Sequence, residues 1–282
     1  MREIKNRDGL NLKLKALNET LQSKLADGLV VAFSGGVDSA FLLWAAERER
    51  QRSGGRLLAL TTTSASFSAA ERHDAEKFIS SQSIDHVWCE SQELSNPQYA
   101  VNDLSRCFHC KSELFDICRR VAVEKELGWV AYGYNASDVS DFRPGHQAAI
   151  DNGILSPLAD SGLVKDEIRF LLKNAGIEMH DKPASPCLSS RLMTGVPITP
   201  RKLRDVEVLE AILRDGGLKV FRIGLHEEGP TRFLRLEIAA EEMEAALQMR
   251  QSLVAEAIAR GYKWVTLDLG GYKAGGANLS LR

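Results

Sequence analysis

The sequence has no long hydrophobic run. No apolar stretch approaches the roughly 18 residues that a membrane-spanning helix needs. The first residues, MREIKNRDGLNLKLKAL, also lack the apolar centre and the small-residue cleavage site of a secretory signal. We therefore expect a cytoplasmic protein without a membrane partner.

An excess of charge of either sign is also missing. Lys and Arg number 36 and Asp and Glu number 38 among the 282 residues, so the formal net charge is −2. Nucleic-acid-binding proteins usually carry a basic surface, so we expect no nucleic-acid partner. A hydrophobic fraction of 44% and a charged fraction of 26% are ordinary for a soluble globular protein, and the length allows two domains.

Cysteine is scarce, and two frameworks are not expected. A disulfide framework is not expected in a reducing compartment, and a four-cysteine zinc ribbon needs a second C-x-x-C that the chain lacks. The single C-x-x-C is compatible with half a zinc site, a redox pair, or two thiols at a helix start. Three cysteines could also hold an iron–sulfur cluster. The five cysteines are Cys89, Cys107, Cys110, Cys118 and Cys187.

Apolar runs and helical patterns alternate in the first part of the sequence. Strands are expected at residues 29–33, 57–63, 85–90 and 129–134. Helices are expected at residues 11–26, about 38–50, 69–82 and 110–127. This alternation predicts an α/β fold, a doubly wound parallel sheet with helices on both faces. Ligands of such sheets bind beyond the carboxyl ends of the strands.

The pattern changes after residue 193. A helix that starts at a Thr-Pro pair is followed by two strands, one long helix and a last strand, within residues 199–217, 218–225, 231–239, 240–261 and 263–269. We therefore predict two domains, residues 1–193 with the parallel sheet and residues 194–282 as a smaller α+β domain.

The loop after the first strand, SGGVDS at residues 34–39, has the composition of an anion-binding turn. Gly35 and Gly36 allow a sharp turn, and the amide groups at the following helix start favour an anion. Ser34 and Ser39 add hydroxyl groups, and Asp38 can serve a cation or cap the helix. The lysine of a G-x-x-x-x-G-K-[ST] loop is missing, which argues against transfer of the outermost phosphate. A generic strand-to-helix turn is the alternative.

SGGVDS resembles the PP-loop of the N-type ATP pyrophosphatases, which are similar to the adenine nucleotide alpha hydrolases. The resemblance implies an enzyme that binds ATP with Mg²⁺, holds the β- and γ-phosphates as departing pyrophosphate, and transfers AMP. It assigns cofactor binding to Ser34, Gly35, Gly36, Asp38 and Ser39, with Asp38 also catalytic.

The remaining segments resemble the LarE sulfur transferases over nearly the whole chain. RCFHCKSELF, GYNASDVSDFRPGHQAA, SPLADSGLVKDEIRFLL, KPASPCLSSR and LDLGGYKAGGANLSL all match LarE segments in LarE order. The resemblance implies adenylation of pyridinium-3,5-biscarboxylic acid mononucleotide and conversion of its carboxylate to a thiocarboxylate, in nickel-pincer nucleotide synthesis. It also implies a sulfide or sulfur donor, and we expect a homo-oligomer.

The sulfur source depends on the cysteines. Some members of the family sacrifice one cysteine, which matches Cys187 here, and leave dehydroalanine. Others hold a 4Fe-4S cluster with three cysteines. Cys107 and Cys110 match the additional pair, so the chain resembles the cluster type, with Cys187 as the third ligand and a catalytic residue.

The resemblance also carries over further site residues. It places Asn135 and Asp138 near the bound nucleotide, and it assigns substrate contacts to Arg143, Lys165, Arg191, Arg222 and Arg235. Lys165 and Arg169 are four residues apart and share a helix face.

One residue departs from the LarE pattern. Gly224 stands where the family commonly has a second arginine, and Arg232 or His226 could compensate.

Two other hypotheses stay open. One is a different PP-loop enzyme, either a tRNA thiolase or an ammonia-using amidating synthetase. The other is a non-catalytic sensor that binds ATP or a cluster.

Overall fold

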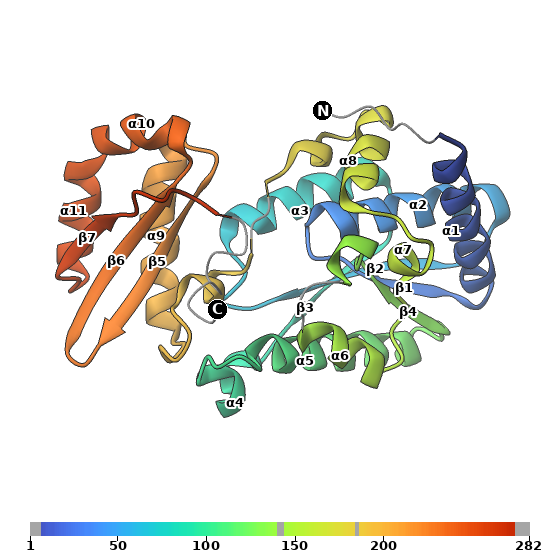
Figure 1. The fold of residues 1–282 in the computed structure, drawn as a ribbon. Coiled ribbons are helices and arrows are strands. Elements are labelled where there is room, and N and C mark those ends of the chain that lie inside the picture. Colours follow the sequence, from blue (N-terminus) through green and yellow to red (C-terminus); the bar gives the residue numbers. More distant parts are fainter. Residues whose placement is uncertain (1–6, 140–143, 184–185, 274–282) are drawn as a thin grey trace. The chain divides into compact units, whose positions relative to one another are not determined.

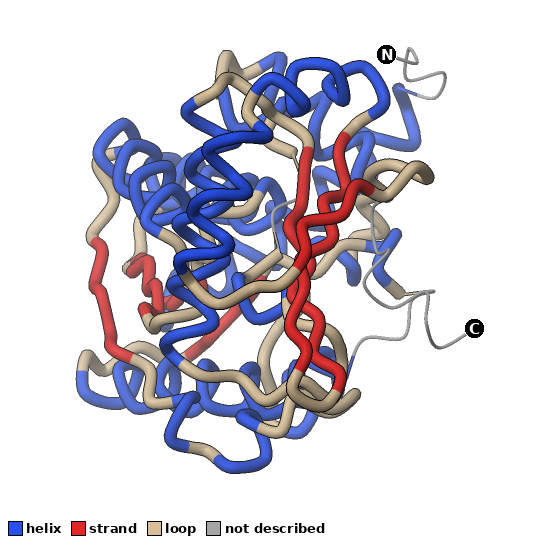
Figure 2. Tube along the Cα trace, turned by 90° about the vertical axis from the view of Figure 1, so that its left-hand side faces the viewer, coloured by secondary structure: helices blue, strands red, loops and turns tan. Residues whose placement is uncertain are grey.

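The structure is a computed structural model that describes residues 7–139, 144–183 and 186–273. The chain forms two compact units. The first comprises Met1–Thr63, Ala69–Glu93 and Cys107–Lys182, and the second comprises Ser64–Ser68, Leu94–Arg106 and Pro183–Arg282. Helices make up most of the regular structure, as the blue segments of Figure 2 show. None of the helices in these ranges combines the length and the apolar character that crossing a membrane requires.

The first unit contains a parallel sheet of four strands, in the order β3-β2-β1-β4. The strands are β1 (Leu29–Ala32), β2 (Leu57–Thr63), β3 (His86–Glu90) and β4 (Trp129–Tyr132). The chain adds strands outward from β1 to β3 and then places β4 on the other side of β1. This reversal creates a topological switch point at the carboxyl ends of β1 and β4, where sheets of this kind bind ligands.

Helices cover both faces of this sheet, with α2 (Val37–Ser53) and α3 (Ala69–Gln82) on one side and α5 (Arg106–Glu124) and α6 (Pro144–Asp151) on the other (Figure 1). The predicted doubly wound α/β fold is therefore confirmed. The remaining helical elements that involve this unit are α1 (Arg7–Asp27), η1 (Glu93–Ser95), η2 (Ala136–Asp138), α7 (Pro157–Asp160), α8 (Lys165–Asn174) and η3 (Glu178–Asp181).

The sheet forms because β1 is apolar on both faces. All four residues of β1 are buried, and the sequence LVVA supplies no polar side chain. Val30 and Ala32 pack with Phe115, Cys118 and other residues on the α5 side. Part of the core of this unit thus lies between β1 and α5.

The second unit contains a sheet of three strands in the order β5-β6-β7. The strands are β5 (Phe221–Glu228), β6 (Thr231–Ile238) and β7 (Trp264–Leu267), with β5 antiparallel and β7 parallel to β6. Its helical elements are α4 (Pro97–Ala100), η4 (Leu188–Arg191), α9 (Pro200–Asp215), η5 (Ala240–Glu242), α10 (Met243–Gln248) and α11 (Arg250–Ala259). The α+β character of this part agrees with the sequence analysis, whereas the predicted boundary between residues 193 and 194 stays a prediction.

The predicted long helix at residues 240–261 is wrong, because it is divided into η5, α10 and α11. Met249, between α10 and α11, has φ −91° and ψ 1°, outside helical geometry. A Cβ at Gly216, beyond the end of α9, would lie 2.1 Å from Met249 Cε, so Met249 packs directly against this glycine. The break coincides with a tertiary contact, and the sequence has no Gly or Pro at this point to indicate it.

Candidate functional site

The loop between β1 and α2 closes tightly against α3. Gly35 has φ +72°, and a Cβ there would lie 3.3 Å from Ala75 Cβ and 3.5 Å from Glu71 O. Only glycine combines this backbone conformation with so close an approach. Ser39 is buried, and its hydroxyl donates to Gly36 O at 3.0 Å and lies 3.1 Å from Ser34 Oγ. The SGGVDS loop is therefore held by hydrogen bonds of its own side chains. It places the start of α2 next to the carboxyl end of β1.

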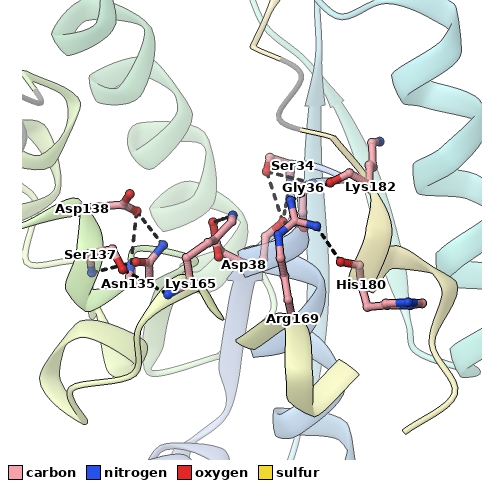
Figure 3. A network of polar contacts seen from close by, with 11 residues as sticks. Ser34, Gly36, Asp38, Asn135, Ser137, Asp138, Lys165, Arg169, His180 and Lys182 are labelled. Carbon is pink, nitrogen blue, oxygen red and sulfur yellow. Dashed lines mark hydrogen bonds and ion pairs between the residues drawn. The ribbon is translucent and has the colours of Figure 1, made fainter. Parts of the chain in front are cut away.

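Asp38 lies in the first turn of α2 and is only half satisfied. Its Oδ2 accepts a hydrogen bond from Lys165 Nζ at 2.5 Å (Figure 3). Its Oδ1 is buried and has no hydrogen-bond partner among the described residues. A buried carboxylate oxygen without a donor is costly, so this atom suits a cation or a ligand donor. Asp38 thus fits the Mg²⁺ that the sequence analysis implied.

Lys165 is the first residue of α8, and two contacts fix the start of that helix. Glu167 accepts a hydrogen bond from Val164 N at 3.0 Å. The same carboxylate binds Lys13 Nζ of α1 at 2.8 and 2.9 Å. The predicted position of Lys165 on a helix is therefore correct, and its side chain turns toward Asp38.

Asn135 and Asp138 form the turn that follows β4. Asn135 is 1% exposed, accepts from Ser137 N at 2.8 Å, and donates through Nδ2 to Asp138 Oδ2 at 2.9 Å. Ser137 Oγ in turn accepts from Lys165 N at 3.1 Å. The ends of β1 and β4 are thereby joined in one polar network (Figure 3).

Two further cations belong to this network, one of which the sequence analysis missed. Arg169 donates to the carbonyl oxygens of His180 at 2.5 Å and Lys182 at 2.8 Å. Lys182 donates through Nζ to Gly35 O at 3.1 Å, and it also contacts Glu71 at 2.9 Å and Asp74 at 2.8 Å. The positive charge that the loop itself lacks comes from Lys165 and Lys182, which are distant in sequence.

Cys107 and Cys110 lie near the start of α5, as the sequence indicated. Cys107 is exposed and Cys110 is half-buried. Their spacing of three residues puts both thiols on one helix face, accessible to a ligand. A pair of this kind meets what a metal cluster requires of two adjacent ligands.

Cys187 belongs to the second unit, where it is exposed directly before η4. Among the residues that the structure describes, no three His, Cys, Asp or Glu side chains form a group that could hold a metal ion.

Arg191 holds the loop that carries Cys187. It is 7% exposed, and its Nη1 donates to Pro186 O and, at 3.4 Å, to Cys187 O. Its Nε donates to Glu210 Oε1 at 3.0 Å, and the same oxygen accepts from Ile223 N at 3.1 Å. Burial would lower the pKa of Arg191, but the Glu210 carboxylate reverses this and raises the pKa. Arg191 therefore stays charged and carries a positive charge to the Cys187 backbone.

Arg222 and Arg235 lie on one face of the β5–β6 pair. Both contact the buried Glu237, Arg222 through a short ion pair and Arg235 at 2.5 Å. Arg235 also reaches Asp268 at 3.4 Å and is 34% exposed, whereas Arg222 is almost fully buried. Of these two predicted substrate contacts, Arg235 is the more accessible.

Gly224 has a local reason to lack a side chain. A Cβ there would lie 3.2 Å from His226 Nε2, and the His226 ring stacks on Phe233 with centroids 4.8 Å apart. An arginine at position 224 would displace this imidazole. Arg143, another predicted substrate contact, lies outside the described residues.

The fold and this loop define an α/β protein with a PP-loop-type domain and a smaller C-terminal sheet. No protein-family model matches the chain. The protein slr1717 of Synechocystis sp., described as uncharacterized, is 35% identical over 254 residues, which cover 89% of this chain and 92% of the relative. The pyridinium-3,5-bisthiocarboxylic acid mononucleotide synthase of Lactiplantibacillus plantarum is 26% identical over 264 residues, which cover 93% of this chain and 94% of the synthase.

A third relative, the uncharacterized MJ0830 of Methanocaldococcus jannaschii, is 23% identical over 93% of this chain and 98% of its own. Each match covers nearly the full length of this chain and of the relative. The chain belongs to the family that it shares with slr1717, a LarE-like family.

Proposed function

We propose that the chain is an ATP-dependent, AMP-forming sulfur transferase that acts on pyridinium-3,5-biscarboxylic acid mononucleotide. The observation that carries this proposal is the SGGVDS loop at the end of β1, with Asp38 Oδ1 buried and without a partner in the described structure. The similarity to the synthase of L. plantarum supports the choice of substrate.

The loop and its neighbours suit the polyphosphate of ATP. The amide groups at the start of α2 would bind the β- and γ-phosphates, with Ser34 exposed beside them. Asp38 would hold Mg²⁺, which neutralises phosphate charge. Lys165 donates a hydrogen bond to the other oxygen of the same carboxylate. Asn135 and Asp138 form the adjoining turn, where the adenylate would lie.

The reaction needs two substitutions. A substrate carboxylate oxygen attacks the α-phosphorus, and the bond from this phosphorus to the oxygen that bridges to the β-phosphorus breaks, so pyrophosphate leaves. The carboxylate is then an acyl adenylate, which has AMP as a good leaving group. A sulfide sulfur attacks the acyl carbon, AMP departs, and the thiocarboxylate remains.

The sulfur would come from a sulfide or sulfur donor through the three accessible cysteines. Cys107, Cys110 and Cys187 would hold a 4Fe-4S cluster that presents a sulfide. The alternative is donation of the Cys187 sulfur itself, which its exposure also allows. The substrate's phosphate and carboxylate groups would be bound by basic residues, and we also propose a homo-oligomer. The basic residues are Arg143, Lys165, Arg191, Arg222 and Arg235.

Anaerobic purification followed by iron and sulfide analysis tests the cluster, and reaction with ATP and the biscarboxylate nucleotide tests the chemistry. We expect pyrophosphate release that depends on this substrate, and a product heavier by the replacement of oxygen with sulfur. Protein that releases no pyrophosphate would contradict the adenylation step and favour a sensor.

Cysteine variants separate the two sulfur sources. Cys107→Ala and Cys110→Ala should abolish repeated turnover, while Cys89→Ala, which changes a half-buried cysteine of β3, should not. A colourless protein that makes product while Cys187 loses the mass of hydrogen sulfide would instead establish sacrificial donation.

A further inference from the structure

A segment that precedes the C-x-x-C belongs to the second unit and binds the loop after Cys187. Tyr99 of α4 places its hydroxyl 2.6 Å from Ser189 Oγ, and both side chains are at most 1% exposed. Arg106, the first residue of α5, donates through Nη1 to Ser189 O at 2.9 Å. Residues 97–106 are thus attached to η4, in which Ser189 lies two residues after Cys187.

Asn102 is the centre of this attachment. It is 1% exposed and has φ +60°, a left-handed conformation that asparagine adopts more readily than most other residues. Its Nδ2 donates to the carbonyl oxygens of Met193 at 3.0 Å and Val196 at 2.9 Å, and its own carbonyl accepts from Gly195 N at 2.8 Å. One buried side chain therefore fixes the chain that continues from η4.

Asn102 and Arg106 act together. Arg106 Nη1 donates to Asn102 Oδ1 at 2.7 Å as well as to Ser189 O. An amide oxygen can accept this bond while the amide nitrogen serves the carbonyl oxygens, so every polar part of Asn102 is used. A lysine at 106 would keep the positive charge and hydrogen-bond donors, but it would lack the planar guanidinium group of Arg106.

We propose that Asn102 and Arg106 are positioning residues for Cys187. They set the backbone of residues 189–196, the segment that follows Cys187 in the chain. This inference rests on the proposed function for its catalytic consequence, because a thiol that takes part in sulfur transfer must be held in one orientation.

The test uses Arg106→Gln, Arg106→Lys and Tyr99→Phe in the full-length protein. Arg119→Gln is the matched control, because Arg119 is an exposed arginine on the same helix. Hydrogen exchange of the amides in residues 187–196 and thiocarboxylate formation are measured for each. Loss of the two hydrogen bonds that Arg106 Nη1 donates, to Asn102 Oδ1 and to Ser189 O, should accelerate exchange in this segment about tenfold in Arg106→Gln.

In Arg106→Gln we expect kcat to fall while the KM for ATP stays unchanged, with partial recovery in Arg106→Lys. Tyr99→Phe removes one hydroxyl and should give a smaller change in the same direction. This variant carries the test if Arg106→Gln fails to fold. Unchanged exchange in residues 187–196, or faster exchange with wild-type kcat, would overturn the inference. If wild-type protein makes no thiocarboxylate, the proposed function fails, whereas the exchange result still decides whether these residues hold the loop.

Discussion

Lys165 Nζ lies 2.5 Å from Asp38 Oδ2, although 127 residues separate the two in sequence. The contact joins the start of α8 to the start of α2 at the carboxyl end of the sheet. It occupies one oxygen of Asp38 and leaves the other buried without a partner in the described structure. The carboxylate is therefore preorganised for a ligand, since Lys165 fixes its orientation.

Asp38→Asn should reduce pyrophosphate release by on the order of 100-fold, because the amide removes the charge that would hold Mg²⁺ and balance Lys165. The release of pyrophosphate with ATP and the biscarboxylate nucleotide measures this. Asp166→Asn is the control, since Asp166 is exposed next to Lys165 and should keep wild-type activity. A wild-type rate in Asp38→Asn would remove Asp38 from the mechanism.

Gly35→Ala should also reduce pyrophosphate release. The alanine would have to adopt the left-handed backbone of Gly35, and its Cβ would lie 3.3 Å from Ala75 Cβ. The conformation alone costs about 1–2 kcal/mol. Gly153→Ala is the matched control, with φ +64° and no atom within 4 Å of the added Cβ. Both variants should lose thermal stability, but only Gly35→Ala should lose pyrophosphate release. Equal activity in the two would show that the loop tolerates a side chain.

The fold could be predicted from sequence because its signals are local. LVVA of β1 is an apolar run, and SGGVDS follows one residue later. The signals for the strand, the loop and the helix therefore all lie within one short stretch of the chain. The start of α9 is equally local, since Thr199 accepts from Lys202 N at 3.3 Å and Pro200 is the first helical residue.

The roles of Lys182 and Asn102, which the sequence analysis missed, depend on contacts between distant segments. In the sequence Lys182 is an ordinary lysine before a proline. Only the structure shows that its Nζ donates to Gly35 O, 147 positions away. Asn102 looks like a surface turn residue, yet it is buried by the chain that follows η4. Gly224 departs from the LarE pattern, and the His226 ring beside it on β5 is held by stacking on Phe233 of the paired strand β6.

Lys182→Met should raise the KM for ATP and lower the free energy of unfolding by about 1.5–3 kcal/mol, since it removes charged hydrogen bonds from a side chain that is 10% exposed. Gly35 O would lose its donor, and Glu71 would lose its cation. Lys77→Met is the control, because the Lys77–Glu178 pair is exposed on both sides. Chemical unfolding measures the change in stability, and ATP-dependent pyrophosphate release measures the KM. A KM for ATP equal to that of Lys77→Met would show that Lys182 does not support ATP binding by the loop.

Glu210→Gln should destabilise the second unit by about 3–5 kcal/mol, because it leaves Arg191 buried without its carboxylate. The same substitution at Glu76, in the exposed Arg72–Glu76 pair, should change stability by at most about 1 kcal/mol. Urea unfolding compares the two variants. If both lose the same small amount, the buried pair does not stabilise the Cys187 loop.

Cys118 should make stability fall at alkaline pH. Burial raises the pKa of its thiol from 9.0 to about 12, and its side chain is fully buried on α5. Above pH 9 the unfolded chain releases this proton while the folded chain keeps it, so the unfolded state binds fewer protons and is favoured as pH rises. The free energy of unfolding should fall by up to about 1.4 kcal/mol per pH unit from this group. Cys118→Ala should be less stable at pH 7 but should show a shallower decline between pH 9 and 11. An unchanged slope in urea unfolding across this range would assign the decline to other groups.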